Sequence, residues 1–431
     1  MVFGRTFRTK VLAALALALF SAISMSPGAC ALSFWHRKHP LVVGYFTNDD
    51  LQKSIPFSVK DLVANGSAAH LDQINYAAAS VSNGRCSLSN PEADLEHTYS
   101  AEDSVDGIAD DPNSAFRGYL HQMQELKRLY PRLKLFISLE GRASDFAYDA
   151  RPENRTAFVR SCVDLYLRGQ FAPGVEVSRL FDGVDIDWES PHRADAANFQ
   201  ALVEEFHRQL RTIRPGLRLS VAIGQSPHMM PGTDFAALNR LVDEFGVMNY
   251  DYSGPWEERT GFVAPLFADS PESRYPLSIR KTIDLFEAAG VPARKMLMGV
   301  PFYGYGWTDV DDANNGLHQM GYALREDRPY KFICTLAEPE KIFRDPRSQA
   351  PWIYNGEDFW TYEDPVSLRY KVSYAVDRGM AGVMIWELSE DTPDAALLNS
   401  VWHSLRHPLP KRVFVQALSA PSHGSSAVAQ R

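Results

Sequence analysis

The sequence is short of the features that would indicate a metal centre, a polyanion-binding surface or a membrane span. It has only four cysteines among 431 residues. None of them forms a Cys-x-x-Cys pair, so we predict no metal site and no cofactor. The net charge of −9 gives no basic excess, which disfavours nucleic acid and anionic membranes as partners. The apolar run Val11–Ile23 is shorter than the roughly 20 residues that a membrane-spanning helix requires.

That apolar run has the flanks of a secretory signal peptide. Basic residues precede it, and the small-x-small triplet Ala29-Cys30-Ala31 follows it. This order is typical of a leader that is removed during export. We therefore expect residues 1–31 to be cleaved and the mature protein to be secreted, either extracellular or periplasmic. A membrane anchor and a lipoprotein attached through Cys30 are the alternatives.

Export would leave three cysteines, Cys86, Cys162 and Cys334. An odd number cannot all pair within one chain, so at most one internal disulfide forms. The sequence does not say which pair would form it, and small buried apolar residues are the simpler interpretation for most of them.

The rest of the chain alternates short apolar runs with amphipathic stretches. Helical periodicity is clear in Asp195–Ile213 and again in Asp394–Leu405. Eight strand–helix units predict a (β/α)8 TIM barrel of the α/β class over residues 39–409. The expected strands are Leu41–Phe46, Gln73–Ser80, Lys134–Leu139, Leu180–Asp187, Arg218–Ile223, Phe245–Tyr250, Met296–Phe302 and Ala381–Trp386.

Two segments are too long for ordinary connections between barrel elements. Cys86–Asn113 follows the second strand. Residues 306–364 follow the seventh, and we predict that they form a small α+β insertion subdomain before the seventh helix. Both should rise from the face on which barrel active sites are built. The tail, 411–431, is rich in Ser and Ala, and we expect it to be disordered.

A row of acids ends the fourth predicted strand, in Phe181-Asp182-Gly183-Val184-Asp185-Ile186-Asp187-Trp188-Glu189. Residues two apart share a face of a strand, so Asp185, Asp187 and Glu189 should point together into the barrel. Like charges in a desolvated space retain a proton, which suits a general acid. Asp182 has the opposite parity and a structural role is expected for it. A solvated acidic loop and a divalent-metal site are the alternatives, and the apolar neighbours and the linear row disfavour them.

This segment matches the D-x-x-D-x-D-x-E signature of family 18 glycoside hydrolases in all four acidic positions, and the chain resembles that family from about Val42 to Leu405. The resemblance is to bacterial chitinases that carry an insertion after the seventh strand. Supporting stretches are Leu41–Phe46, Ile74–Ala77, Lys134–Ser138, Val247–Tyr252, Gly299–Gly304 and Gly382–Glu387.

The resemblance implies a substrate-assisted, retaining mechanism. Glu189 would be the general acid and base, while the 2-acetamido group of the substrate attacks the anomeric carbon. Asp187 would hold the acetamido N–H, and Asp185 would share a proton with Asp187. Tyr250 would donate its hydroxyl to the acetamido oxygen.

The resemblance also implies a substrate and a set of residues that contact it. The partner would be chitin or its oligosaccharides, bound by a monomer. The implied substrate-binding residues are Asp251, Met248, Trp386, Tyr45, Tyr303 and Trp256.

The chain departs from the family pattern at two positions. Glu140 stands where a small residue is common, in Ser138-Leu139-Glu140-Gly141. Ser138, which should hydrogen-bond Asp185, is kept. Tyr305 stands where many members have Arg, which puts one substrate contact in doubt.

Two other functions share this sequence pattern. An endo-β-N-acetylglucosaminidase would use the same chemistry on the chitobiose core of N-glycans, although such members tend to lack the Tyr250-Asp251 pair. A chitin-binding lectin without activity usually loses the acid or its partner, and both are present here. We therefore predict a secreted chitinase.

Overall fold

The fold is a closed parallel barrel, seen in a computed structural model that describes residues 39–53, 55–268 and 278–420. The chain divides into two units at residue 38, and all described residues belong to the second. The predicted signal peptide, 1–31, lies outside the described residues. None of the described helices is long and apolar enough to cross a membrane.

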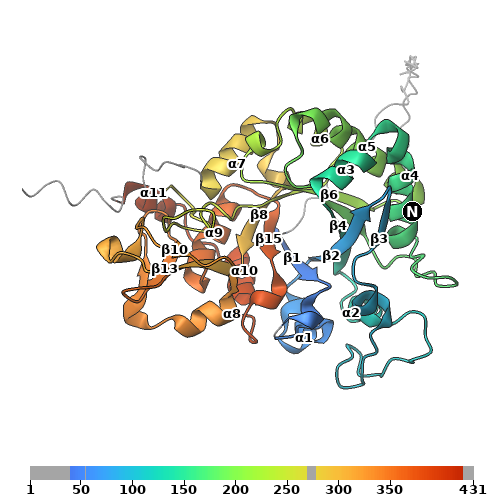
Figure 1. The fold of residues 1–431 in the computed structure, drawn as a ribbon, viewed down its shortest axis with the longest axis horizontal. Coiled ribbons are helices and arrows are strands. Elements are labelled where there is room, and N and C mark those ends of the chain that lie inside the picture. Colours follow the sequence, from blue (N-terminus) through green and yellow to red (C-terminus); the bar gives the residue numbers. More distant parts are fainter. Residues whose placement is uncertain (1–38, 54, 269–277, 421–431) are drawn as a thin grey trace, which may run out of the picture. The chain divides into compact units, whose positions relative to one another are not determined.

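Eight parallel strands form the barrel, and β1 closes it by pairing with both β2 and β15 (Figure 1). The predicted TIM barrel is therefore confirmed. The strand order around the ring is β1-β15-β8-β7-β6-β5-β4-β2. The strands are β1 (Leu41–Thr47), β2 (Gln73–Ser82), β4 (Lys134–Glu140), β5 (Gly183–Asp187), β6 (Arg218–Ile223), β7 (Glu244–Val247), β8 (Met296–Pro301) and β15 (Gly382–Trp386).

Helices cover the outside of the barrel because each has an apolar stripe. In α5 (Ala196–Ile213), the buried stripe includes Phe199, Val203 and Phe206, in agreement with the helical periodicity of Asp195–Ile213. Burying one such side chain contributes about 1.5–3 kcal/mol. The other helices are α1 (Val59–Ala64), α2 (Gly118–Leu129), α3 (Ala143–Asp149), α4 (Pro152–Cys162), α6 (Phe235–Leu238), α7 (Ile279–Ala288), α9 (Pro365–Asp377) and α10 (Ala396–Arg406).

A second, antiparallel sheet lies between β8 and α9, on one side of β8 and β15 (Figure 1). It occupies the place predicted for the insertion but begins at Tyr303, earlier than the predicted start at 306. Its strands are β9 (Tyr303–Thr308), β10 (Tyr322–Ala323), β11 (Arg328–Pro329), β12 (Ile342–Arg344), β13 (Pro351–Tyr354) and β14 (Phe359–Thr361), with the short helix α8 (Tyr330–Ile333).

Several predicted boundaries differ from the structure, and the fourth barrel strand begins at Gly183 rather than Leu180. The sixth barrel strand, β7, ends at Val247 rather than Tyr250, because the Asn249 amide turns back to the Val247 carbonyl and Asp251 takes a positive φ of 62°. The tail was predicted to be disordered from 411, and this is wrong for α11 (Arg412–Ser419). Phe414 is buried there with its ring 5.5 Å from that of Tyr374. Residues 421–431 lie outside the described part of the chain.

A disulfide joins Cys86 to Cys162, whereas Cys334 has a free thiol. The expectation that most of these cysteines are simple buried apolar residues is therefore wrong for that pair. Cys86 lies on β3 (Arg85–Leu88), which pairs antiparallel with β2. The bond ties this added strand, in which Cys86 lies opposite Val81 near the end of β2, to the end of α4.

Loss of this disulfide should lower stability but not activity. The bond closes a loop with a sequence separation of 76, so Cys86→Ser is expected to reduce the free energy of unfolding by about 2–5 kcal/mol. Denaturant unfolding of oxidised protein measures the loss. Cys334→Ser, which removes the free thiol, is the control and should unfold like the wild type. Equal stability of both variants would contradict the prediction.

Candidate active site

A cleft of about 670 Å³ opens at the carboxyl ends of the barrel strands. Of the residues predicted to act on substrate, Asp185 lies buried below the cleft and Trp256 lies outside it. The predicted residues that line it are Tyr45, Asp187, Glu189, Met248, Tyr250, Asp251, Tyr303 and Trp386.

Asp185 is held by three hydroxyl groups, two from the strands beside β5 and one, that of Tyr45, from β1. The hydroxyls of Tyr45 and Ser138 donate to Oδ2 over 2.6 Å and 3.1 Å, and Ser220 donates to Oδ1. The register explains the two serines, because Ser138 on β4 and Ser220 on β6 both lie directly opposite Asp185 on β5. The hydrogen bond expected from Ser138 is therefore present. Burial raises the pKa of Asp185, and the three hydroxyls oppose that rise.

Asp187 lies one step higher on the same face of β5, as the period of two predicted. The residue is only 9% exposed, and its Oδ1 has no hydrogen-bond partner among the described residues. Burial raises the pKa of Asp187 well above its usual range, and the charges of Glu140, Asp185 and Glu189 raise it further. An unpartnered buried carboxylate is costly unless a ligand supplies a donor.

Glu189 follows the end of β5 and lines the cleft. Burial raises its pKa, and the Asp251 charge adds to the rise. The side chain therefore keeps its proton at a higher pH than an ordinary glutamic acid does.

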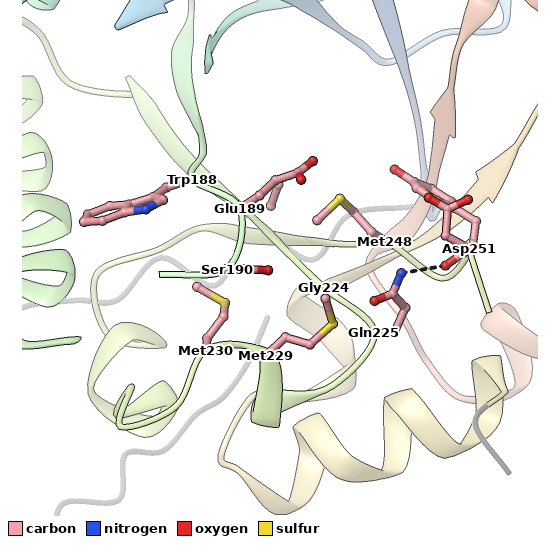
Figure 2. A pocket seen from close by; sticks show the side chains of 11 residues that line it. Trp188, Glu189, Ser190, Gly224, Gln225, Met229, Met230, Met248 and Asp251 are labelled. Carbon is pink, nitrogen blue, oxygen red and sulfur yellow. Dashed lines mark hydrogen bonds between the residues drawn. The ribbon is translucent and has the colours of Figure 1, made fainter. Parts of the chain in front are cut away.

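Beside Glu189 lies a smaller pocket of about 80 Å³, lined by the segments that follow β5, β6 and β7. Figure 2 shows Ser190, Met229 and Met248 around this space, while the Trp188 ring is directed away from Met248. Gln225 donates to the Tyr250 carbonyl over 2.8 Å, which fixes the loop after β6 to the segment after β7. Sequence reasoning missed this loop, because it carries no charged motif.

Tyr250 and Asp251 form the opposite wall. Burial raises the pKa of Tyr250 well above its usual value, and the nearby carboxylates add to this effect, so its hydroxyl keeps a proton to donate. Asp251 accepts at Oδ1 from Tyr303 over 2.6 Å and from Tyr305 over 3.0 Å. Tyr305, the residue that replaces a common Arg, thus orients Asp251 by a neutral hydrogen bond.

Aromatic rings complete the cleft. Trp386 lines it, with its ring centroid 5.1 Å from that of Tyr45. A wide ring gives the apolar face of a sugar a surface on which to pack. Trp256 is 58% exposed and does not line the cleft, but its ring lies 5.7 Å from Tyr305, which does.

Two carboxylates of the cleft were not predicted as site residues, Glu140 and Asp327. Burial raises the pKa of Glu140 to about 7, with further contributions from nearby carboxylates. Its departure from the family pattern was the signal in the sequence. Asp327 comes from the second sheet region, and no motif marked it. Within the described ranges, no group of three or more His, Cys, Asp or Glu side chains could hold a metal ion.

Comparisons with known proteins agree with this geometry. The sequence profile of Glycosyl hydrolases family 18 matches residues 41–391. Chitinase C of Streptomyces lividans is 29% identical over 81% of this chain and 57% of its own length. Chitinase 63 of Streptomyces plicatus is 27% identical over 84% of this chain and 60% of its own.

The chain thus spans less than two thirds of the length of these two relatives. Among solved structures, the catalytic domain of the psychrophilic chitinase B from Arthrobacter TAD20 superposes with a TM-score of 0.77 and 28% identity. That likeness covers 86% of this chain and 97% of the other.

Proposed function

The chain belongs to glycosyl hydrolase family 18, and from this premise we propose that it is a chitinase that cleaves β-1,4 bonds between N-acetylglucosamine units with retention. The observation that carries the proposal is the pairing of Glu189 with Asp187 in one cleft. Glu189 lines the cleft with a raised pKa, and two residues before it Asp187 has a buried oxygen that no described residue bonds.

The first step breaks the glycosidic bond. Glu189 gives its proton to the leaving oxygen while the acetamido carbonyl oxygen of the substrate bonds to the anomeric carbon, which forms an oxazolinium ion. Asp187 accepts the acetamido N–H at its free oxygen and stabilises the positive charge. Water then attacks the anomeric carbon from the face that the leaving oxygen had occupied, and the bond from that carbon to the acetamido oxygen breaks. The proton of the water returns to Glu189, and the starting configuration is kept.

The other residues position the reacting sugar. Tyr250 donates its retained proton to the acetamido oxygen, and Asp251 contacts the sugar. Trp386 packs under the ring. Asp185 lies below Asp187 within its hydroxyl network, where it can share the proton that two adjacent carboxylates retain.

The test is the product profile of the purified protein on chitin hexasaccharide, read by mass spectrometry with anomer analysis. We expect shorter oligomers in the β-anomeric form. α-Anomeric products would exclude the retaining mechanism. An untouched hexamer together with glycan release from a high-mannose glycoprotein would favour an endo-β-N-acetylglucosaminidase, and binding without turnover would favour a lectin.

We also propose that the protein works outside the cytoplasm. The disulfide between Cys86 and Cys162 supports this, because such bonds persist mainly in oxidising compartments. The signal-like segment 1–31 is consistent with the same destination.

A further inference from the structure

Glu140 is a carboxylate that the proposed reaction does not use. It is the last residue of β4, and the parallel register places it directly opposite Asp187 on β5. Two residues earlier, the same register brings Ser138 into hydrogen-bond contact with Asp185. Because side chains two apart share a face, Glu140 points into the same cleft as Asp187.

Among the described residues, none forms an ion pair with the Glu140 carboxylate. Its Oε1 is buried and has no hydrogen-bond partner in the described part of the chain. The cation that lines the cleft, Arg142, is turned to Asp145 instead, with contacts of 2.8 Å and 3.2 Å. A buried carboxylate without donors is costly, so a ligand that brings donors would gain free energy here.

Asp187, which lies opposite Glu140 on the neighbouring strand, also has an oxygen that receives no hydrogen bond from the described residues. The residue lines the cleft and is nine-tenths buried, and this oxygen, Oδ1, is itself buried. Glu189, Asp251 and Asp327 add three more carboxylates to the same walls. Such a cleft has a negative potential that favours positively charged ligands over neutral ones.

We propose that Glu140 binds the ammonium group of an N-deacetylated glucosamine unit in the sugar position on the β4 side of Glu189, so that partly deacetylated chitin is a preferred substrate. This inference rests on the proposed function, since the unit that is cleaved must keep its acetamido group to act as nucleophile. The deacetylated unit therefore lies next to it. A carboxylate in the place of a small residue supplies a charge-assisted acceptor for which a neutral acetamido group has no equivalent.

The test compares wild type with Glu140→Gln on two substrates, chitin hexasaccharide and a soluble, partly deacetylated chitosan of known composition. Glutamine keeps the size of the side chain and removes the charge. We expect the ratio of kcat/KM on chitosan to that on the hexasaccharide to fall by at least about tenfold, the effect of one charge-assisted hydrogen bond. Sequencing of the chitosan products should show glucosamine enriched at one position beside the cut in the wild type and not in the variant.

Glu326→Gln is the matched control. It removes one charge from a side chain that is 77% exposed and does not line the cleft, so the ratio should stay that of the wild type. An equal loss on both substrates would mean that Glu140 contacts a neutral sugar, and would overturn the ammonium site, as would an unchanged product pattern. If the wild type cleaves neither substrate, the proposed hydrolase function is wrong, and so is the ammonium site at Glu140 that rests on it. If the wild type cleaves the hexasaccharide but Glu140→Gln does not change the ratio of kcat/KM values, only the ammonium site is wrong and the hydrolase function stands.

Discussion

Glu189→Gln is expected to lower kcat by about 10²–10⁴-fold, the usual contribution of general acid catalysis. Glutamine has nearly the same shape but no transferable proton, so the glycosidic oxygen would leave as an unprotonated alkoxide. Binding should persist, because the other cleft-lining side chains are unchanged. The loss of kcat is measured by following turnover of chitin hexasaccharide, and the retained binding is measured by calorimetry with the same oligomer.

The control for this substitution is Glu204→Gln, on the exposed side of α5, which should turn over like the wild type. The pH profile gives a second readout. Since burial raises the pKa of Glu189, the protonated acid is present below that raised value and is lost as the pH rises through it. The alkaline fall of kcat/KM should therefore begin above the ordinary range of a glutamic acid. Near wild-type turnover by Glu189→Gln would contradict the assignment of the acid.

Asp187→Asn is expected to lower kcat by about 10²–10³-fold, a loss typical of removing one electrostatic contact to the developing charge. The amide is neutral and cannot balance the oxazolinium ion, and its NH₂ group would face the acetamido N–H as a second donor. The effect should fall mainly on kcat, since the charge develops only in the reaction. Steady-state kinetics on chitin hexasaccharide separate kcat from KM.

Asp182→Asn is the matched control within the same motif. Asp182 accepts from Lys127 Nζ over 2.6 Å and from the Leu135 amide over 3.1 Å, so its side chain is structural, as its parity predicted. The control should lower the unfolding midpoint and leave turnover per folded molecule close to wild type. If Asp187→Asn raised KM alone, its proposed role on the reacting charge would be wrong.

The barrel could be predicted from sequence because its strands carry local signals. Strands buried on both faces read as continuous apolar runs, and the predicted start of β6 at Arg218 and of β8 at Met296 agrees with the structure. The row of acids was predictable for a similar reason. Once a strand is assigned, the period of two decides which side chains share a face.

What could not be predicted depends on contacts between distant segments. The partner of Cys86 is determined by where β3 lies against α4, which no local pattern reveals. The α11 helix packs through Phe414, which is buried beside Tyr374 of α9, a contact between segments that are distant in the sequence. Asp327 reaches the cleft only through the pairing of the second sheet.

The second sheet is joined to the barrel with a single residue between them. β8 ends at Pro301 and β9 begins at Tyr303, and the Phe302 amide between them donates to the Trp386 carbonyl over 2.7 Å. Such a short junction leaves no linker that could act as a hinge between the barrel and the second sheet. The sheet is therefore not a module that can be cut out or grafted at will. Deleting the second sheet would also remove Tyr303 and Tyr305 of β9, whose hydroxyls hold Asp251. Changes to the width of the cleft are therefore better made in the loops of the sheet beyond β9.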